Sequence, residues 1–234
     1  MEITEGHRIL FLKQRDLKYD QQHGAKEKAA IAIKKNYCKC IFVPVLFILC
    51  LWLNNLFVNP IDQYSMFGKV SVSAANIFAW FGVQVFLINP LFVGIIHFYI
   101  CNSRSRSILS DVLPKSNYSQ VVIGMFLKDV FILLWSCMFL APGIVKLYEY
   151  SMVPYLFADC PELSWREVFR ESKRLMKGNK MDTFVLELSF VGWMLLAFCT
   201  CGIVAVFWVN AYVFATGTEL YLFLCQQKTE VSPI

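Results

Sequence analysis

Five polar side chains lie inside otherwise apolar stretches of this sequence and could carry chemistry: His97, Lys128, Asp129, Glu187 and Glu219. A charged side chain in the hydrocarbon of a bilayer is costly, so such groups generally face the protein interior and mark a binding or transport site. At a rise of about 1.5 Å per helical residue, all five lie in the cytoplasmic half of the stretches that contain them. We expect them to converge on one polar pocket that opens towards the cytoplasm.

A structural role is the competing interpretation of the same charges. A lysine near the end of a span can extend its ammonium group to the headgroup layer. Glu187 and Glu219, on neighbouring antiparallel spans, can each pair with Lys128 or with a loop cation and so fix the packing of the helices. Lys146 and Glu149, spaced i,i+3 on the outer half of a further span, can pair on their own helix. The sequence leaves both interpretations open.

Motifs of the common enzyme classes are missing from this sequence. It has no His-Glu-x-x-His, no Gly-x-Ser-x-Gly and no phosphate-binding glycine loop. Of its three histidines, His97 alone lies outside the N-terminal segment. Two cysteine pairs have a suggestive spacing, Cys38 with Cys40 and Cys199 with Cys201, but zinc sites usually need two such pairs in a polar fold. We therefore expect neither an enzyme nor a metal or cofactor site.

The elements that must position these residues follow from the composition. The chain is 57% hydrophobic and 17% charged, whereas soluble domains are about half apolar and about a quarter charged. Its apolar residues fall in blocks suited to cross about 30 Å of hydrocarbon, which takes about 20 helical residues. The sequence therefore predicts an all-α, polytopic membrane protein with about six transmembrane helices. The expected segments are a basic N-terminal region 1–40, a membrane domain 41–225 with spans at about 41–58, 72–101, 120–141, 144–158, 183–199 and 202–225, and a tail 226–234.

Two proline motifs interrupt the predicted spans. Asn89-Pro90 lies near the middle of 72–101, where proline removes a helical hydrogen bond, and predicts a kink or break. Pro142-Gly143 follows the third span and predicts a tight reversal into the fourth. The fourth span, 144–158, is short for a crossing. If it does not cross, the third and fourth spans form a re-entrant hairpin.

Basic amphipathic helices are expected on the cytoplasmic face of the membrane. One precedes the first span, and the other covers about 165–177, where Ser164 and Glu167 form a capping-box pattern and Gly178 supplies the stop. Basic residues on such helices suit an anionic leaflet. The residues expected to contact lipid headgroups are Lys34, Lys35, Lys39, Lys173, Arg174, Lys177 and Lys180.

The distribution of basic residues orients the chain in the membrane. The N-terminal region, the loops 102–119 and 159–182 and the C-terminal tail together hold 19 of the 22 lysines and arginines. Cytoplasmic loops carry an excess of these residues. We therefore expect both termini in the cytoplasm. The basic face fits anionic lipid better than nucleic acid, because it adjoins the spans.

A series of motifs resembles the bacterial integral membrane family called domain of unknown function nine-seven-five. The resemblance is strongest over about 120–224 and weaker in Asn36-Tyr37 and Pro90-Leu-Phe-Val-Gly94. It implies a six-helix membrane protein and no particular activity. The motifs are Leu134-Trp135, Pro142-Gly143-Ile144-Val145-Lys146, Tyr148, Tyr150-Ser151-Met152, Pro154-Tyr155, Glu171-Ser172, Leu175-Met176-Lys177-Gly178 and Leu188-Ser189-Phe190-Val191-Gly192-Trp193.

These features favour a non-enzymatic accessory protein of the bacterial membrane. Its helices and basic face would bind anionic lipid and a membrane partner, which is a second copy of the chain or another protein. An immunity-type subunit fits the same features. The alternative is a small transporter or lipid flippase that uses the pocket of buried charges.

Overall fold

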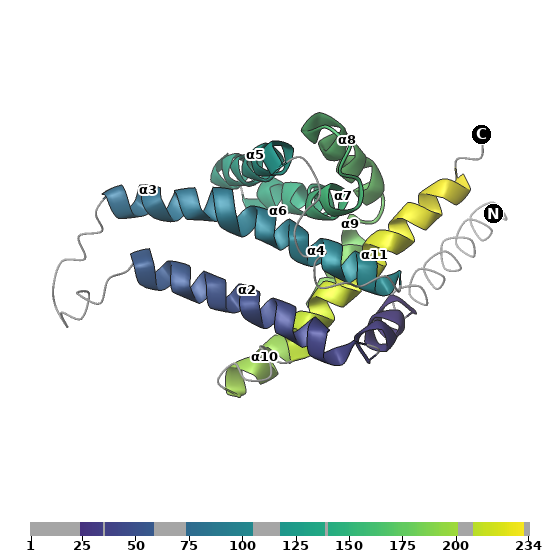
Figure 1. The fold of residues 1–234 in the computed structure, drawn as a ribbon. Helices are drawn as coiled ribbons and strands as arrows, with labels where there is room; N and C mark the ends of the chain where they lie inside the picture. Colours follow the sequence, from purple (N-terminus) through teal and green to yellow (C-terminus); the bar gives the residue numbers. More distant parts are fainter. Residues whose placement is uncertain are drawn as a thin grey trace.

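All the elements that the structure describes are helices, which confirms the predicted all-α class. The computed structural model describes residues 24–34, 36–58, 74–104, 118–138, 140–200 and 208–231 (Figure 1). A helix over 24–34 comes first, followed by α2 (Tyr37–Val58), α3 (Ala74–Val83), α4 (Asn89–Ser103), α5 (Tyr118–Met138), α6 (Leu140–Glu149), α7 (Val153–Asp159), α8 (Trp165–Met176), α9 (Lys180–Leu188), α10 (Val191–Cys199) and α11 (Asn210–Val231).

Three helical stretches are long and apolar enough to cross a membrane. They are Tyr37–Asn54 in α2, Phe78–Ser103 across α3 and α4, and Tyr118–Met138 in α5. These lengths support membrane association, because a crossing takes about 20 apolar residues. The described ranges contain no further helix of this length and hydropathy. The segment 59–71, expected to join the first two spans on the outer side, lies outside the described residues, and so do residues 201 and 202 of the outer joint expected at 200–202.

The regions expected as the fourth and fifth spans are each divided into two short helices. Within 144–158, a turn separates α6 from α7, and Pro154 lies in the first turn of α7, where its missing N–H costs no helical bond. Within 183–199, α9 and α10 flank a turn in which Ser189 Oγ donates to the carbonyl of Leu186 at 2.5 Å. Each of these four helices is shorter than a crossing requires.

The second expected span continues through its proline without a break. α3 leads into a π-helical turn, Gln84–Ile88, and then into α4, and the N–H of Asn89 donates to the carbonyl of Gln84. In an α-helix, the carbonyl of Phe86 would pair with the N–H that Pro90 lacks. It accepts a hydrogen bond from the Tyr118 hydroxyl of α5 instead. The irregularity expected at the proline therefore takes the form of a wider turn just before it.

α5 and α6 form a hairpin that reverses before the Pro142-Gly143 motif rather than at it. α6 begins at Leu140, so Pro142 and Gly143 both lie in its first turn, which tolerates proline. A Cβ atom at Gly143 would lie 2.8 Å from the Cα of Ser136 on α5. The missing side chain at Gly143 therefore allows the two helices to approach closely.

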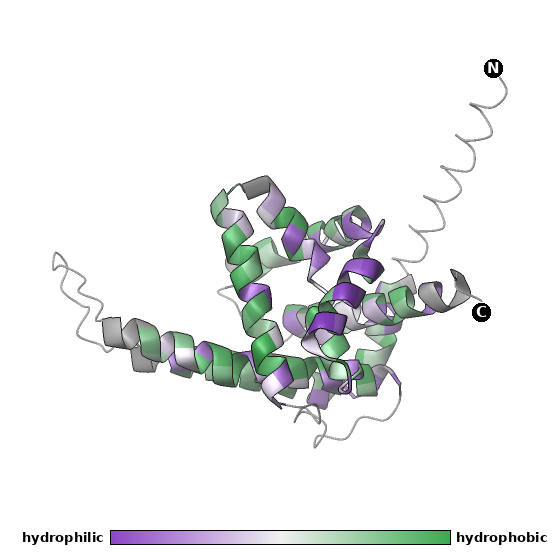
Figure 2. Ribbon diagram, turned by 90° about the horizontal axis from the view of Figure 1, so that it is seen from above, coloured by the Kyte–Doolittle hydropathy of each residue, from purple (hydrophilic) through white to green (hydrophobic). Residues whose placement is uncertain are grey.

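Large apolar side chains are exposed on several helices, whose hydrophobic residues colour the ribbon green in Figure 2. Soluble proteins seldom expose contiguous apolar surface on this scale, whereas lipid-facing helices do. The exposed residues include Phe42, Leu46, Leu49 and Trp52 of α2, Phe78 and Phe81 of α3, Leu133, Leu134 and Met138 of α5, and Trp193, Met194 and Leu195 of α10.

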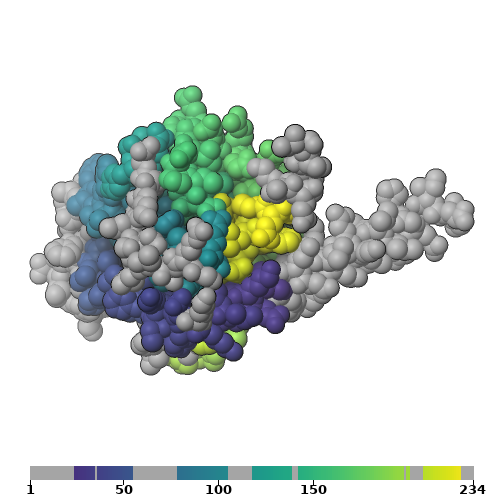
Figure 3. Space-filling view, turned by 45° about the vertical axis from the view of Figure 1, so that its right-hand side comes forward, coloured from purple at the N-terminus to yellow at the C-terminus, as the bar shows by residue number. Residues whose placement is uncertain are grey.

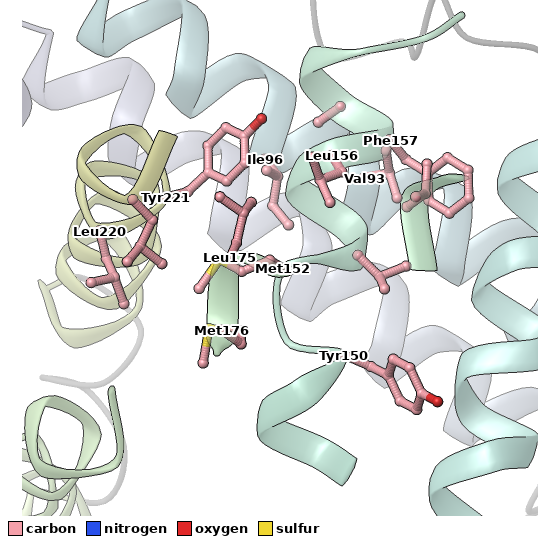
Figure 4. Close-up of a cluster of buried hydrophobic side chains, with 14 of the residues drawn as sticks. Val93, Ile96, Tyr150, Met152, Leu156, Phe157, Leu175, Met176, Leu220 and Tyr221 are labelled. Carbon is pink, nitrogen blue, oxygen red and sulfur yellow. The ribbon is translucent and has the colours of Figure 1, made fainter. Parts of the chain in front are cut away.

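The largest buried core joins α4, α5, α7, α8 and α11. Figure 4 shows side chains from α4, α7, α8 and α11 around a common centre, among them Val93, Phe157, Met176 and Tyr221. Gly124 of α5 leaves room for the ring of Phe157, since a Cβ there would overlap that ring. These helices are held together by apolar packing against one another.

A second core fastens the N-terminal helix and α2 to α4 and α11. Tyr99 of α4 belongs to this core, and its hydroxyl donates to the carbonyl of Cys40 at 2.6 Å. Its ring stacks on that of Phe214, with the ring centroids 5.6 Å apart. Figure 3 shows residues 24–34 in purple beside α11 in yellow. The start of the described chain and its last helix therefore lie side by side.

α8 begins at the expected capping residue and packs its apolar stripe on protein. The N–H of Ser164 donates to Glu167 Oε2 at 2.9 Å, and this hydrogen bond holds the pKa of Glu167 below its ordinary value. Val168, Ser172 and Met176 are buried against neighbouring helices. α5, α6 and α7 pack against this stripe, and the expected position of α8 on the membrane face stays a prediction.

Substituting Gly143 with alanine tests the close approach of α5 and α6. We expect Gly143→Ala to lower the free energy of unfolding by about 1–3 kcal/mol, because the new methyl group meets the backbone of α5. Gly192→Ala on α10 is the control, since no atom lies within 4 Å of its added Cβ. Thermal unfolding in detergent measures both. Equal melting temperatures for the two variants would contradict the close packing.

Candidate functional site

A cavity of about 320 Å³ lies where α4, α5, α9 and α11 meet the turn between α6 and α7. Its lining is largely apolar and includes Phe92, Leu186 and Phe190. Two charged side chains line it as well, Lys128 of α5 and Glu187 of α9. Its volume is at the lower end of the range for small-molecule sites, about 300–1,000 Å³. This cavity is the candidate functional site.

Lys128 and Glu187 have separate partners. The ammonium nitrogen of Lys128 lies 3.3 Å from Oδ1 of Asp129, and Oε2 of Glu187 accepts a hydrogen bond from the Tyr148 hydroxyl at 2.7 Å. Within the described residues, no ion pair joins Lys128 to Glu187. An ammonium has three donors and a carboxylate has two acceptor oxygens, so both groups keep unused hydrogen-bonding capacity.

Thr216 of α11 adds a polar atom without a partner to this lining. Its side chain is fully buried, and Oγ1 makes no hydrogen bond within the described part of the chain. Thr218, two residues later, instead donates to the carbonyl of Phe214 at 2.9 Å. Buried hydroxyl groups are nearly always hydrogen-bonded, so Thr216 is an exception that requires a physical account.

The remaining three charged or imidazole residues of the expected pocket lie elsewhere. Asp129 faces α4, where Asn89 Nδ2 donates to its Oδ2 at 3.0 Å. Glu219 accepts from Ser103 Oγ at 2.5 Å at the end of α4, and His97 lies beside Cys101 on α4. The structure thus brings Lys128 and Glu187 to one cavity and does not bring all five residues together. The helical rise gives depth along a span but not the direction in which each side chain points.

Glu149 is an ionic centre whose full partner set the sequence does not reveal. Its carboxylate contacts three ammonium groups: Lys146 at 3.2 Å, Lys180 at 3.1 Å and Lys173 at 3.6 Å. The expected pair of Lys146 with Glu149 is therefore formed, and α8 and α9 add two further lysines to it. The lysines that follow residue 172 in the sequence could have suggested further partners for this carboxylate.

The lysines and arginine expected at lipid headgroups divide into two groups. Lys173 and Lys180 point to Glu149, so they have a structural partner. The side chains of Lys34, Lys39, Arg174 and Lys177 are exposed. Lys35 lies outside the described residues.

One end of the bundle gathers polar groups from four parts of the chain. Arg104, just after α4, binds both oxygens of Asp159 at the end of α7, at 2.5 and 3.0 Å. The hydroxyl of Tyr221 on α11 donates to the same carboxylate at 3.1 Å. A second cavity of about 620 Å³ lies beside this junction, lined by Lys28 of the N-terminal helix and by Glu219.

Two polar residues were not expected at this site: Thr216, which lines the cavity, and Tyr148, whose hydroxyl binds Glu187. Both are neutral, and a search for charges inside apolar stretches passes over them. The run Thr216-Gly217-Thr218 does interrupt the apolar span 202–225 and could have pointed to this position. The described ranges hold no group of three His, Cys, Asp or Glu side chains suited to a metal ion.

A family model described as "Protein of unknown function (DUF975)" matches residues 83–228. This match confirms the resemblance noted in the sequence, and it includes every residue that lines the candidate cavity. No curated protein and no solved structure matches the chain.

Neutralising Glu149 tests the ionic centre. We expect Glu149→Gln to lower the free energy of unfolding by about 1–2 kcal/mol, because three ammonium groups then repel one another without a carboxylate. Glu162→Gln removes an exposed carboxylate and serves as the control. Thermal melting in detergent, followed by circular dichroism, compares the two variants. A melting temperature for Glu149→Gln equal to that of the control would show that the centre contributes nothing.

Proposed function

This chain belongs to the DUF975 family, and we propose that it is a non-enzymatic, multi-pass protein of the bacterial cell membrane that binds a membrane-protein partner. The long apolar helices α2, α3–α4 and α5 support its place in the membrane. The exposed apolar face of α5 is the main evidence that the protein binds a partner.

The polar junction supports a topology with both termini on the cytoplasmic side. Arg104 begins the region after α4, Asp159 ends α7, and Tyr221 belongs to the last helix, yet their side chains meet. Gly24, Ala25 and Lys28 line the cavity at the same end of the bundle. All these chain segments adjoin the lysine- and arginine-rich regions, and such regions stay in the cytoplasm.

α5 and α6 enter the membrane without crossing it in this proposal. Figures 1 and 2 together show α5 running across the direction of the long α3–α4 helix rather than beside it. The carboxylate of Glu149 at the end of α6 also contacts Lys173 and Lys180, which belong to the cytoplasmic region 159–182. A re-entrant hairpin accounts for both facts, and α2, α3–α4, α9–α10 and α11 then make the crossings.

Thiol labelling distinguishes the re-entrant hairpin from a six-span arrangement. Cys137 is exposed near the end of α5 and is kept as the single cysteine. In intact cells, a membrane-impermeant maleimide should leave Cys137 unlabelled, because the hairpin tip stays in the membrane. Ser65→Cys, in the expected outer joint, and Gln226→Cys, in the expected cytoplasmic tail, are the accessible and protected controls. Labelling of Cys137 equal to that of Ser65→Cys would establish a full crossing.

The exposed side of α5 is the proposed partner surface. Leu133 is 66% exposed, Leu134 58% and Met138 63%. These exposed apolar side chains give a neighbouring membrane protein a surface on which to pack. In membranes, such contacts rest on shape and packing, because lipid is as apolar as the helix surface.

Affinity purification after mild extraction tests the partner surface. We expect the parent chain to leave the membrane in a complex, and the triple variant Leu133→Ala, Leu134→Ala, Met138→Ala to lose at least about fivefold of it, since the packed side chains are removed. The control carries Leu46→Ala, Leu49→Ala and Leu53→Ala on the exposed side of α2. Native mass spectrometry identifies a second copy or a different protein as the partner. A strictly monomeric parent chain, or equal loss in both triple variants, would overturn the proposal.

A further inference from the structure

We propose that the cavity among α4, α5, α9 and α11 binds a small zwitterionic molecule that carries an apolar group. Lys128 would bind its anionic end, Glu187 its ammonium end and Thr216 an adjacent polar atom, with the apolar group against Phe92 and Phe190. This site goes beyond the proposed partner surface and does not depend on it, because the two lie on different sides of α5: Lys128 is largely buried, whereas Leu134 faces outward.

The separation of two opposite charges in one cavity is the first step towards this ligand. The side chain of Lys128 is 17% exposed, whereas Glu187 lies on the exposed side of the cavity. Lys128 and Glu187 nevertheless line the same cavity without forming an ion pair. Lys128 instead pairs with Asp129, and Glu187 accepts a hydrogen bond from the Tyr148 hydroxyl. A molecule with both charges would fill the gap and pair each of them.

The unpartnered hydroxyl of Thr216 is the second and independent step. The described structure offers its Oγ1 no hydrogen bond, although the side chain is fully buried. Thr216 is one of the residues that line the cavity, so a rotation of its side chain about χ1 would let a bound molecule supply the missing partner. Thr183, on the opposite helix α9, already donates to the carbonyl of Asn179 at 3.0 Å and has no such need.

The size and lining of the cavity define the rest of the ligand. Phe92 and Phe190 both line the cavity, and each packs on a further ring: the ring centroids are 5.7 Å apart for Phe92 and Phe214 and 5.6 Å apart for Phe190 and Tyr212. A volume of about 320 Å³ is too small for a two-chain phospholipid but admits a compact zwitterion with an apolar side. Two sources share this chemistry, a free apolar α-amino acid and the ammonium-bearing headgroup of an aminophospholipid with its chains outside the cavity.

Calorimetric titration and native mass spectrometry separate the two sources. In the first arm, L-leucine and L-phenylalanine are titrated into the full chain in detergent, with N-acetyl-L-leucine and L-leucinamide as probes that lack one charge. In the second arm, the chain in nanodiscs is offered phosphatidylethanolamine or phosphatidylglycerol. We expect binding in one arm, with the zwitterion preferred over each singly charged probe or over phosphatidylglycerol. No binding in either arm would overturn the proposal.

Matched substitutions tie any binding to the cavity. We expect Lys128→Met and Glu187→Gln each to weaken binding about tenfold or more, because each leaves one ligand charge without its partner. Glu219→Gln is the control, since its carboxylate binds Ser103 outside this cavity. Affinities that stay at the parent value in both cavity variants would overturn the site.

Thr216→Val keeps the test decisive if the charge variants fail to fold. It removes a hydroxyl that has no partner in the protein, so the ligand-free chain should melt at the same or a higher temperature. Binding should nevertheless weaken severalfold. Thr218→Val removes a hydroxyl that bonds within α11 and should leave binding unchanged. Equal effects of the two threonine variants on binding would contradict the role of Thr216.

Discussion

A charge removed from water must find an opposite charge, and this constraint organises the half of the protein built from α5 to α9. Glu149 meets it with three lysines, which come from α6 and from the segments on either side of the turn after α8. The contacts pull α8 against the α5–α6 hairpin, and Ser172 Oγ adds a hydrogen bond to the carbonyl of Glu149 at 2.9 Å. The apolar side chains of α8 then pack into the core, because Lys173 on the same helix is bound to Glu149.

Local features of the fold could be predicted from the sequence because a few neighbouring residues determine them. Ser164 and Glu167 start α8 at the expected residue, and Gly178 follows it with a φ of 87°, a conformation that favours glycine. The long apolar stretches of α2, α3–α4 and α5 could be predicted as well, since the length of a hydrophobic stretch is a local property of the sequence. The family membership followed from motifs of the same short range.

Contacts between distant parts of the chain could not be predicted in this way. Lys128 and Glu187 share a cavity, whereas Asp129, the next residue after Lys128, turns to Asn89 on another helix. Adjacent helical residues point about 100° apart, so depth in a span does not decide which of them meet. The hydrogen-bond partner of the Phe86 carbonyl could not be predicted either. Pro90 indicates that this carbonyl lacks its helical partner, but only the packing of α5 brings the Tyr118 hydroxyl to it.

The π-helical turn before Pro90 has a consequence for the two surfaces of the long helix. Such a turn inserts one residue and so rotates everything after it by about 100° relative to a regular helix. Before it, α3 presents Phe78 and Phe81 outward; after it, Val93 and Ile96 of α4 are completely buried. One continuous helix thus has two differently oriented halves: α3 exposes its apolar side chains, and α4 buries them against other helices. The π-helical turn between the halves is the place where Tyr118 of α5 binds.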